Sequence, residues 1–442
     1  MSKLIERVVA VQLLRYLEEN GLMPKHQSGF RKGHSTETLL VRLLSDIHQA
    51  MDSGRVTLLA LLDVSAAFDS VDHHILLTRL AASYGISGRA LAWFCSYLEG
   101  RTMRVEIGDD RSVWAPVVCG VPQGSVLGPL LFILYTADLY DVVASLGPTS
   151  HQFADDLQLY LSCRPEDSVV CAQQMHCALA VVHDWMSANR LKLNPTKSQF
   201  IWFGTKRARC RIDENALVSA SLGGQSCDVV RDLGVLLDGG LTMAEHVSHI
   251  SRTSYYELRQ IRVIRRTLSL SAAAVLIHSF VLTRLDYCNG VLLGLPEFRI
   301  RQLQLVQNAA ARLLADLPKY SHISDYMRRE LHWLPVADRV NFKIATLVWK
   351  AMTGTAPDYI AELCLPVGTQ TGRRALRSAS RNDLIVPSFR TITRARRDFS
   401  IAAPRIWNTL PPSLRATNAA CGYMVFSRLL KTHFFSCLMA TC

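Results

Sequence analysis

The sequence predicts an α/β protein whose first half carries the strands and whose second half is mostly helical. Three observations support this fold class. Strand-like and helix-like runs alternate up to about residue 240, helical periodicity prevails from Met243 onward, and prominent acidic residues follow strand-like runs. With 442 residues, of which 49% are hydrophobic and 19% charged, the chain can form two or three domains around a large core.

In the first half, the spacing of apolar residues distinguishes helices from strands. Apolar side chains three and four residues apart predict helices, and continuous or alternating β-branched runs predict strands. The expected helices span residues 3–19, 36–52, 71–82, 89–98, 129–143 and 168–187. The expected strands span residues 56–64, 198–203 and 229–237, and hairpins are expected over residues 101–118 and around the turn at 153–156.

The second half is expected to be a series of helices, over residues 245–266, 271–288, 298–315, 336–352 and 424–434. No apolar run reaches the roughly 18 residues that a membrane span needs, and the N-terminus lacks a signal-peptide pattern. The 12 cysteines form no CxxC pair and no zinc-finger spacing with histidine. We therefore expect a soluble, intracellular protein with no membrane partner and no structural zinc.

The charge of the chain is unevenly distributed. Residues 1–240 hold 22 Lys and Arg against 25 Asp and Glu, whereas residues 241–442 hold 27 against 12. A basic second half indicates a polyanion partner, most simply nucleic acid, and a solvated or membrane-facing surface is the alternative. Within it Arg252, Arg259, Arg262 and Arg266 share one face of the helix expected over 245–266.

Three aspartates in the first half suggest a metal site. Asp155 and Asp156 stand side by side after Phe153 and Ala154 at the expected hairpin turn, and Asp63 ends the expected strand 56–64. If the two strands are neighbours in one sheet, the carboxylates converge and can bind two hard cations, as phosphoryl transfer requires. The alternative for Asp155 and Asp156 is that they lie in a solvated turn without a metal. The charges alone do not separate polymerisation from hydrolysis.

Two glycine-containing loops accompany the aspartates. The basic loop Gln27–Thr36 has the composition of a phosphate cradle, and Gly120–Pro129 carries glycines around a Pro-Gln pair that let backbone approach a ligand closely. The alternative for the second loop is a tight connection that caps the helix after it.

Five segments together resemble the motifs of reverse transcriptases. Leu61–Val71, with Asp63-Val64-Ser65-Ala66-Ala67-Phe68-Asp69, resembles motif A, Gly120–Pro129 motif B, and Phe153–Asp156 motif C. Leu191–Lys197 resembles motif D and Leu233-Gly234 motif E, in the same order and spacing. The particular residues of these motifs are similar to those of reverse transcriptases from non-LTR, LINE-type retrotransposons. Residues 331–335 and 402–411 resemble the C-terminal region of jockey-like elements, so the resemblance covers nearly the whole chain.

The resemblance implies a two-metal active site. Asp63 and Asp155 would bind two magnesium ions, for which manganese could substitute, with Asp156 beside them and the Val64 carbonyl as a further ligand. Lys197 would approach the leaving pyrophosphate as a cation or proton donor.

The resemblance also implies a nucleotide pocket. Phe68 would lie under the sugar of the incoming nucleotide and exclude a 2′-hydroxyl. The amides of Ala66 and Ala67 would face the triphosphate, Gln123 and Gly124 would line the pocket, and Arg31 would contact template or phosphate.

The implied fold is a right-hand polymerase with an antiparallel palm sheet. We expect partial, truncated fingers over 1–55, a palm over 56–240, a helical thumb over 241–320 and a basic C-terminal region over 321–442. The thumb arginines Arg252, Arg259, Arg262 and Arg266 would grip the backbone of the template-primer duplex.

The implied function is RNA-directed DNA synthesis during target-primed retrotransposition. Its partners would be an RNA template, a DNA primer or target and deoxynucleoside triphosphates, with integration in the nucleus and synthesis of the protein in the cytoplasm. The alternative is a catalytically silent remnant that only binds nucleic acid. The sequence leaves the oligomeric state open.

Overall fold

The computed structural model describes residues 2–194, 196–213, 215, 225–369, 382–416 and 419–440. Pro195 of the predicted motif D and residues 370–381 of the predicted C-terminal region lie outside the described residues. The chain divides into two compact units. We call residues 1–32, 57–202 and 207–227 the sheet unit, and residues 33–56, 203–206 and 228–442 the helical unit.

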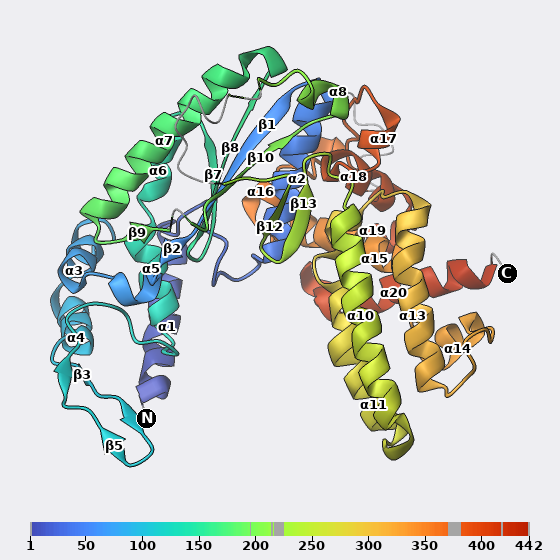
Figure 1. Ribbon diagram of the computed structural model, residues 1–442, viewed down its shortest axis with the longest axis horizontal. Helices are drawn as coiled ribbons and strands as arrows, with labels where there is room; N and C mark the ends of the chain where they lie inside the picture. Colours follow the sequence, from blue (N-terminus) through green and yellow to red (C-terminus); the bar gives the residue numbers. More distant parts are fainter. Residues whose placement is uncertain are drawn as a thin grey trace. The chain divides into compact units, whose positions relative to one another are not determined.

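The sheet unit is built on a five-stranded sheet with the strand order β11-β10-β1-β8-β7 (Figure 1). Its strands are β1 (Val56–Leu62), β7 (Thr149–Phe153), β8 (Asp156–Cys163), β10 (Gln199–Phe203) and β11 (Gln225–Ser226). Strands β7 and β8 pair antiparallel, as expected, but β10 and β11 pair parallel. The expectation of a wholly antiparallel sheet is therefore wrong at this edge, because a crossover connection, which passes through α8, returns the chain to run alongside β10.

Helices pack around this sheet as the apolar spacing predicts. They are α1 (Ser2–Glu19), α3 (His73–Ala82), α4 (Gly88–Leu98), α5 (Gly128–Thr136), α6 (Leu139–Ala144), α7 (Ser168–Ala188) and α8 (Lys206–Arg209), with 3-10 turns η1 (Ala67–Ser70) and η2 (Pro165–Asp167). One continuous core joins helix α1 and helices α3 through α7 to the sheet, with Phe132, Tyr135 and Leu159 among its fully buried residues. The single helix expected over 129–143 is two helices, separated at Asp138, whose carboxylate pairs with Arg79 at 2.9 Å.

Short strand pairs complete the sheet unit. The predicted hairpin over 101–118 is confirmed, with β3 (Thr102–Met103) paired to β6 (Ala115–Pro116) and β4 (Glu106–Ile107) paired to β5 (Asp110–Arg111). A further pair, β2 (Val64–Ser65) with β9 (Lys192–Leu193), joins predicted motifs A and D.

The helical unit contains α2 from the first half of the chain and the helices of the second half. They are α2 (Thr36–Asp52), α10 (Ala244–Ile264), α11 (Leu270–Ile277), α12 (Thr283–Asp286), α13 (Glu297–Leu314), α14 (Ser324–Arg329), α15 (Val336–Met352), α16 (Asp358–Ala361), α17 (Ile392–Ala395), α18 (Phe399–Thr409), α19 (Pro412–Arg415) and α20 (Gly422–Ala440). Shorter segments are η3 (Arg265–Thr267), the π-helical η4 (His278–Leu282), η5 (Asn289–Leu292), η6 (Val367–Thr369) and η8 (Ala419–Cys421). The helices predicted over 245–266, 298–315 and 336–352 are confirmed within two residues.

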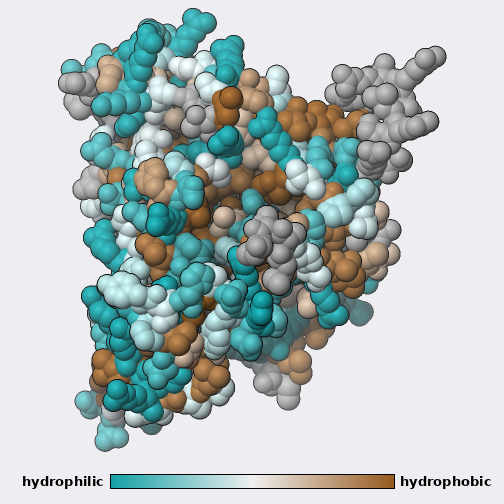
Figure 2. Space-filling model, turned by 90° about the vertical axis from the view of Figure 1, so that its right-hand side faces the viewer, coloured by the Kyte–Doolittle hydropathy of each residue, from teal (hydrophilic) through white to brown (hydrophobic). Residues whose placement is uncertain are grey.

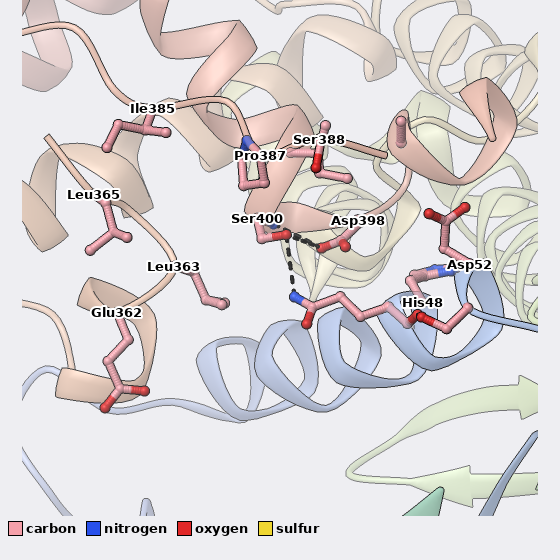
Figure 3. A pocket seen from close by; sticks show the side chains of 14 residues that line it. His48, Asp52, Glu362, Leu363, Leu365, Ile385, Pro387, Ser388, Asp398 and Ser400 are labelled. Atoms are coloured by element: carbon pink, nitrogen blue, oxygen red, sulfur yellow. Dashed lines mark hydrogen bonds between the residues drawn. The ribbon is translucent and has the colours of Figure 1, made fainter. Parts of the chain in front are cut away.

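Helix α2 is a largely buried helix of the helical unit. Most of its residues are buried, and its polar side chains reach segments far along the chain. Glu37 accepts a hydrogen bond from the amide of Gly290 at 2.8 Å, and Ser45 donates to the carboxylate of Asp398 at 2.6 Å. Asp398 also caps α18 through Ser400, and these side chains line a pocket of about 400 Å³ beside α2 (Figure 3). The C-terminal region is therefore packed onto α2.

Aromatic side chains form the core under α15, α18 and α20. Trp349 stacks on Phe426 with ring centroids 5.2 Å apart, and Trp407 lies 6.2 Å from the same ring. Figure 2 shows one face of the molecule, on which hydrophilic and hydrophobic residues are interspersed. Scattered exposed apolar residues of this kind are normal for a globular surface.

The segment predicted as one strand over 229–237 is instead a hairpin. Strand β12 (Val229–Asp232) pairs antiparallel with β13 (Val235–Asp238), and Leu233 and Gly234 form the turn with φ of 45° and 85°. Both turn residues are in the left-handed region that two-residue hairpin turns need. The prediction of a single strand is wrong because Asp232 and Gly234, which flank Leu233, mark a turn between two short apolar segments.

Candidate active site

The three predicted aspartates meet at two neighbouring strands of the sheet unit. Asp63 lies between β1 and β2, and Asp155 and Asp156 lie at the turn from β7 to β8. Strands β1 and β8 are adjacent in the sheet, which satisfies the condition that the sequence left open. The turn needs a left-handed residue, and Ala154 supplies it with φ of 58°. Asp155 is half-buried and Asp156 is exposed at this turn, so the solvated-turn alternative is compatible with the structure as well.

The carboxylates are close enough to influence one another. The pKa of Asp156 is raised to about 6, first by partial burial of the carboxyl group and then by the negative charges of Asp155 and Asp63. The ammonium of Lys197 acts in the opposite direction. Its Nζ lies 3.2 Å from Oδ2 of Asp63, so the predicted proton donor is placed against a predicted metal ligand.

The chemistry of this donor set fits hard divalent cations. Carboxylate oxygens are the ligands that magnesium prefers, and one lysine compensates only part of the charge of three aspartates. Among the residues that the structure describes, however, no group of three or more His, Cys, Asp or Glu side chains is arranged as a ready metal site. Lys197 holds Asp63 in an ion pair instead.

Motif D is held against motif A by backbone pairing. Val64 faces Leu193 and Ser65 faces Lys192 in the β2–β9 pair, and the amide of Asn194 donates to the carbonyl of Asp63 at 2.9 Å. This register sets the position of Lys197, which lies three residues beyond Asn194 in the following turn.

Motif B is bonded onto motif A. The amide of Val121 donates to the carbonyl of Phe68 at 2.8 Å, and a Cβ on Gly120, which has φ of 87°, would lie 2.9 Å from the carbonyl oxygen of Asp69. Gln123 donates from Nε2 to both carboxylate oxygens of Asp69 at 3.0 Å. Gly120 therefore has to be glycine for the close approach, and Gln123 joins the two motifs through Asp69, a residue that we had not assigned to the site.

Phe68 is half-buried between other aromatic rings. Its ring centroid lies 4.8 Å from that of Phe132 and 6.4 Å from that of Phe30, which meets it edge-on. The preceding residues form a tight turn in which Ala66 has φ of 46° and its carbonyl accepts from the amides of Asp69 and Ser70. Gly124 lies in the motif B loop and also has a positive φ, of 73°.

Gln27 is a residue of this site that the sequence analysis missed. Its side chain is 1% exposed, its Oε1 accepts from the amide of Ala154 at 2.8 Å, and its Nε2 donates to the carbonyl of Ala154 at 3.1 Å. Gln27 thus holds both backbone groups of the turn residue next to Asp155. The nearby Gly29 was the available signal, because a Cβ there would collide with the backbone of Ala154.

Arg31 braces the same loop. Its guanidinium donates to the carbonyl of Gln27 at 3.1 Å and also to that of Pro24. Arg31 therefore holds the backbone of the first half of the predicted phosphate-cradle loop, and this half supports the motif C turn through the side chain of Gln27.

The predicted arginine face belongs to α10 and η3 in the helical unit. Arg252, Arg259, Arg262 and Arg266 are exposed, and the opposite face of α10 is buried through Val247, Leu258 and Ile261. None of the four arginines forms an ion pair with a carboxylate in the described part of the chain. By contrast Arg265 is engaged in the fold, because its guanidinium donates to the carbonyls of Leu313 and Leu314.

No helix within the described ranges combines the length and the apolar character that crossing a membrane would require.

Comparison with known proteins gives the family. Residues 1–235 match the family described as reverse transcriptase (RNA-dependent DNA polymerase). The probable RNA-directed DNA polymerase from transposon BS of Drosophila melanogaster is 30% identical over 355 residues, which cover 77% of this chain and 38% of that protein. The corresponding protein from transposon X-element of the same species is 31% identical over 349 residues, covering 77% and 37%.

More distant similarity extends to two further proteins. The RNA-directed DNA polymerase from mobile element jockey of Drosophila melanogaster is 25% identical over 339 residues, covering 74% of this chain and 36% of the relative. A telomerase structure from Candida albicans aligns over 74% of this chain and 56% of that chain with a TM-score of 0.35 and 10% identity. The chain spans less than two fifths of the length of the curated relatives that it matches. Because the family match covers more than half of the chain, and motifs A to D lie together in the sheet unit, the chain belongs to the reverse transcriptase family, in its LINE-type, non-LTR branch.

Proposed function

We propose that this chain catalyses RNA-templated DNA synthesis by extending a primer 3′-hydroxyl with deoxynucleoside triphosphates. The observation that carries the proposal is the convergence of Asp63 with Asp155 and Asp156 from neighbouring strands. Hydrolysis of phosphodiesters would also use such carboxylates, but it would not need the nucleotide pocket that we assign to Phe68 and Gln123.

Asp63, Asp155 and Asp156, with the carbonyl of Val64, would hold two magnesium ions or manganese in their place. When bound, such ions activate the primer hydroxyl and neutralise the charge of the triphosphate. Binding of a cation would release Lys197 from Asp63. The ammonium of Lys197 would then be free to donate a proton to the leaving pyrophosphate.

The nucleotide would lie against Phe68, whose ring would exclude a 2′-hydroxyl by steric clash. The backbone amides of Ala66 and Ala67 would face the triphosphate, and Gln123 and Gly124 would line the other side. In this proposal the hydrogen bonds from Gln123 to Asp69 fix the motif B loop at the pocket wall.

The sheet unit would serve as the palm, and α10 with its neighbours as the thumb. Exposed arginines without ion-pair partners lose little when they move onto phosphates, so Arg252, Arg259, Arg262 and Arg266 suit backbone contact with a duplex. The process served would be target-primed retrotransposition in the nucleus.

Primer extension on an RNA template tests the proposal. We expect Asp155→Asn to reduce extension by on the order of a thousandfold or more while the affinity for template-primer is retained. Asp109→Asn, which alters an exposed carboxylate in the β4–β5 turn, is the matched control and should leave extension unchanged. Equal extension by the wild-type chain and Asp155→Asn would overturn the proposed active site.

A second candidate function is nucleic-acid binding without catalysis. The ion pair between Lys197 and Asp63 favours it, because this contact closes the site to a cation unless the lysine moves. The same assay distinguishes the two. Wild-type protein that binds template-primer but extends nothing, at any magnesium or manganese concentration, would support the binding-only function.

A further inference from the structure

The helical unit contains a second polar cavity, of about 590 Å³. It lies between the N-terminal end of α2, the segment before α15, and helices α15 and α20. This volume is in the range of sites that hold a nucleotide-sized ligand. No residue of the carboxylate site lines it, so its ligand would be bound independently of the catalytic aspartates.

The cavity carries an excess of positive charge. Four cations line it, Arg339, Lys343, Lys350 and Lys431, against two carboxylates, Glu37 and Asp286. Lys343 pairs with Glu37 at 3.1 Å, and Arg339 pairs with Asp286. These pairs use both carboxylates, so two lysine charges are left for a ligand.

Lys350 and Lys431 are the two lysines without a carboxylate partner in the described residues. Lys350 lies over the ring of Tyr423 with Nζ 5.2 Å from its centroid, and Lys431 lies 5.8 Å from that of Phe435. Burial, and then the charge of Lys343, lower the pKa of Lys350. An anion in the cavity would relieve this repulsion.

Two other features favour a nucleotide over a simple ion. Asn289 lines the cavity and is 2% exposed. Its Oδ1 has no hydrogen-bond partner in the described part of the chain, so it can accept a hydrogen bond from a donor group on a ligand or from water. The rings of Tyr423 and Phe342 also line the cavity and offer faces on which a base can stack.

The N-terminus of α2 adds to the attraction for an anion. Gly33 and His34 lead into the helix with Gly33 at φ of 80°, and Ser35 caps it by accepting from the amide of Thr38. The partial positive charge of this 17-residue helix therefore acts at the cavity wall.

We propose that this cavity binds one nucleotide of a nucleic-acid single strand, with its phosphate held by Lys350 and Lys431. This proposal rests on the proposed function in one respect only, namely that the ligand is a nucleic acid. It assigns to α15 and α20, from the region predicted as a basic C-terminal module, a contact with the strand that the polymerase copies or extends.

The test is binding, measured in the Asp155→Asn background so that catalysis plays no part. Fluorescence anisotropy of a labelled single-stranded RNA, and of DNA of the same sequence, gives affinity over a series of salt concentrations. Each phosphate contact on a single strand contributes about 0.7 to the slope of log affinity against log salt. We expect Lys350→Gln with Lys431→Gln to reduce the slope by roughly 1.4.

The matched control is Lys319→Gln with Arg301→Gln. It removes two exposed cations of the same unit, and Lys319 also lies over a tyrosine ring, at 5.3 Å. The charge-preserving pair Lys350→Arg with Lys431→Arg should keep the wild-type slope, which separates loss of contact from loss of folding. A slope for the glutamine pair equal to that of the control overturns the proposal. So does lysine-dependent binding of free uridine monophosphate without any effect on strand binding.

Discussion

At the scale of single residues, Phe68 is the side chain whose replacement is most informative. Its ring contacts those of Phe132 and Phe30. We expect Phe68→Ala to admit ribonucleotides, because removing the ring opens space for a 2′-hydroxyl. Primer extension with ribonucleoside and deoxyribonucleoside triphosphates measures the change. Val113→Ala, which removes an exposed apolar side chain outside the site, is the control and should leave discrimination unchanged. Unchanged discrimination in Phe68→Ala would refute the assignment.

Gln27 gives a second prediction at this scale. Replacing it by alanine leaves two backbone groups of Ala154 without partners and opens a small cavity, which we expect to cost about 1–3 kcal/mol of unfolding free energy. Extension should fall as well, because Ala154 precedes Asp155. Chemical denaturation and primer extension check the two effects. Gln12→Ala, at an exposed position on α1, should change neither, and a stable but inactive Gln27→Ala would assign Gln27 a role beyond positioning.

At the scale of elements, the junction of the β12–β13 hairpin with α10 is predicted to be sensitive to acid. His246 is 3% exposed, its Nδ1 faces the amide of Leu236 at 3.4 Å, and its Nε2 has no hydrogen-bond partner among the described residues. Burial, then the charges of His249 and Arg231, lower the pKa of His246 to about 4. The folded state therefore resists a proton that the unfolded chain accepts near pH 6.5.

Because the pKa of His246 is lower in the folded than in the unfolded chain, acid lowers the free energy of unfolding. The stability that neutral His246 supports is complete above about pH 6.5 and decreases as the pH falls toward 4, by at most about 2 kcal/mol at pH 5. His246→Gln should remove this part of the pH dependence, whatever its effect at neutral pH. Denaturation at pH 7 and pH 5 measures it, with His322→Gln, at an exposed position, as the control. An unchanged pH dependence in His246→Gln would contradict the prediction.

Elements with strong periodicity were predictable, and those defined by a local turn were not. The helices α1 and α2 follow from apolar spacing, and the turn that carries Asp155 follows from an acidic pair beside a strand-like run. All three agree with the structure. The β12–β13 hairpin was missed because its two-residue turn, Leu233 and Gly234, leaves apolar residues on both sides, so the segment resembles one strand when the signal of Asp232-Leu233-Gly234 is overlooked. Of the candidate site, the three aspartates were predicted from their positions at strand ends and Phe68 from the resemblance of its motif, and these roles stay predictions. The contacts of Gln27 and Asp69 were not, because each joins segments more than 50 residues apart.

At the scale of the whole molecule, the sequence does not reveal which segments fold together. We predicted α2 as part of the fingers and residues 321–442 as a separate basic region, and these boundaries remain predictions. The compact units nevertheless group α2 with residues 228–442. The reason lies in side-chain contacts that no local pattern signals, such as Ser45 with Asp398 and Arg42 with Glu362 at 2.8 Å.

This grouping predicts that the chain unfolds in two steps, one for each compact unit. Asp398→Ala removes the cap of α18 and the buried contact to α2, which should cost about 2–3 kcal/mol in the helical unit. Gln27→Ala should lower the other transition. Calorimetry resolves the two steps, and hydrogen exchange with mass spectrometry identifies which peptides open in each. In Asp398→Ala, α2 should lose protection together with α18, whereas α1 and β8 should keep it. If α2 instead loses protection with α1, the helix belongs to the sheet unit in solution and the contacts with Asp398 are secondary.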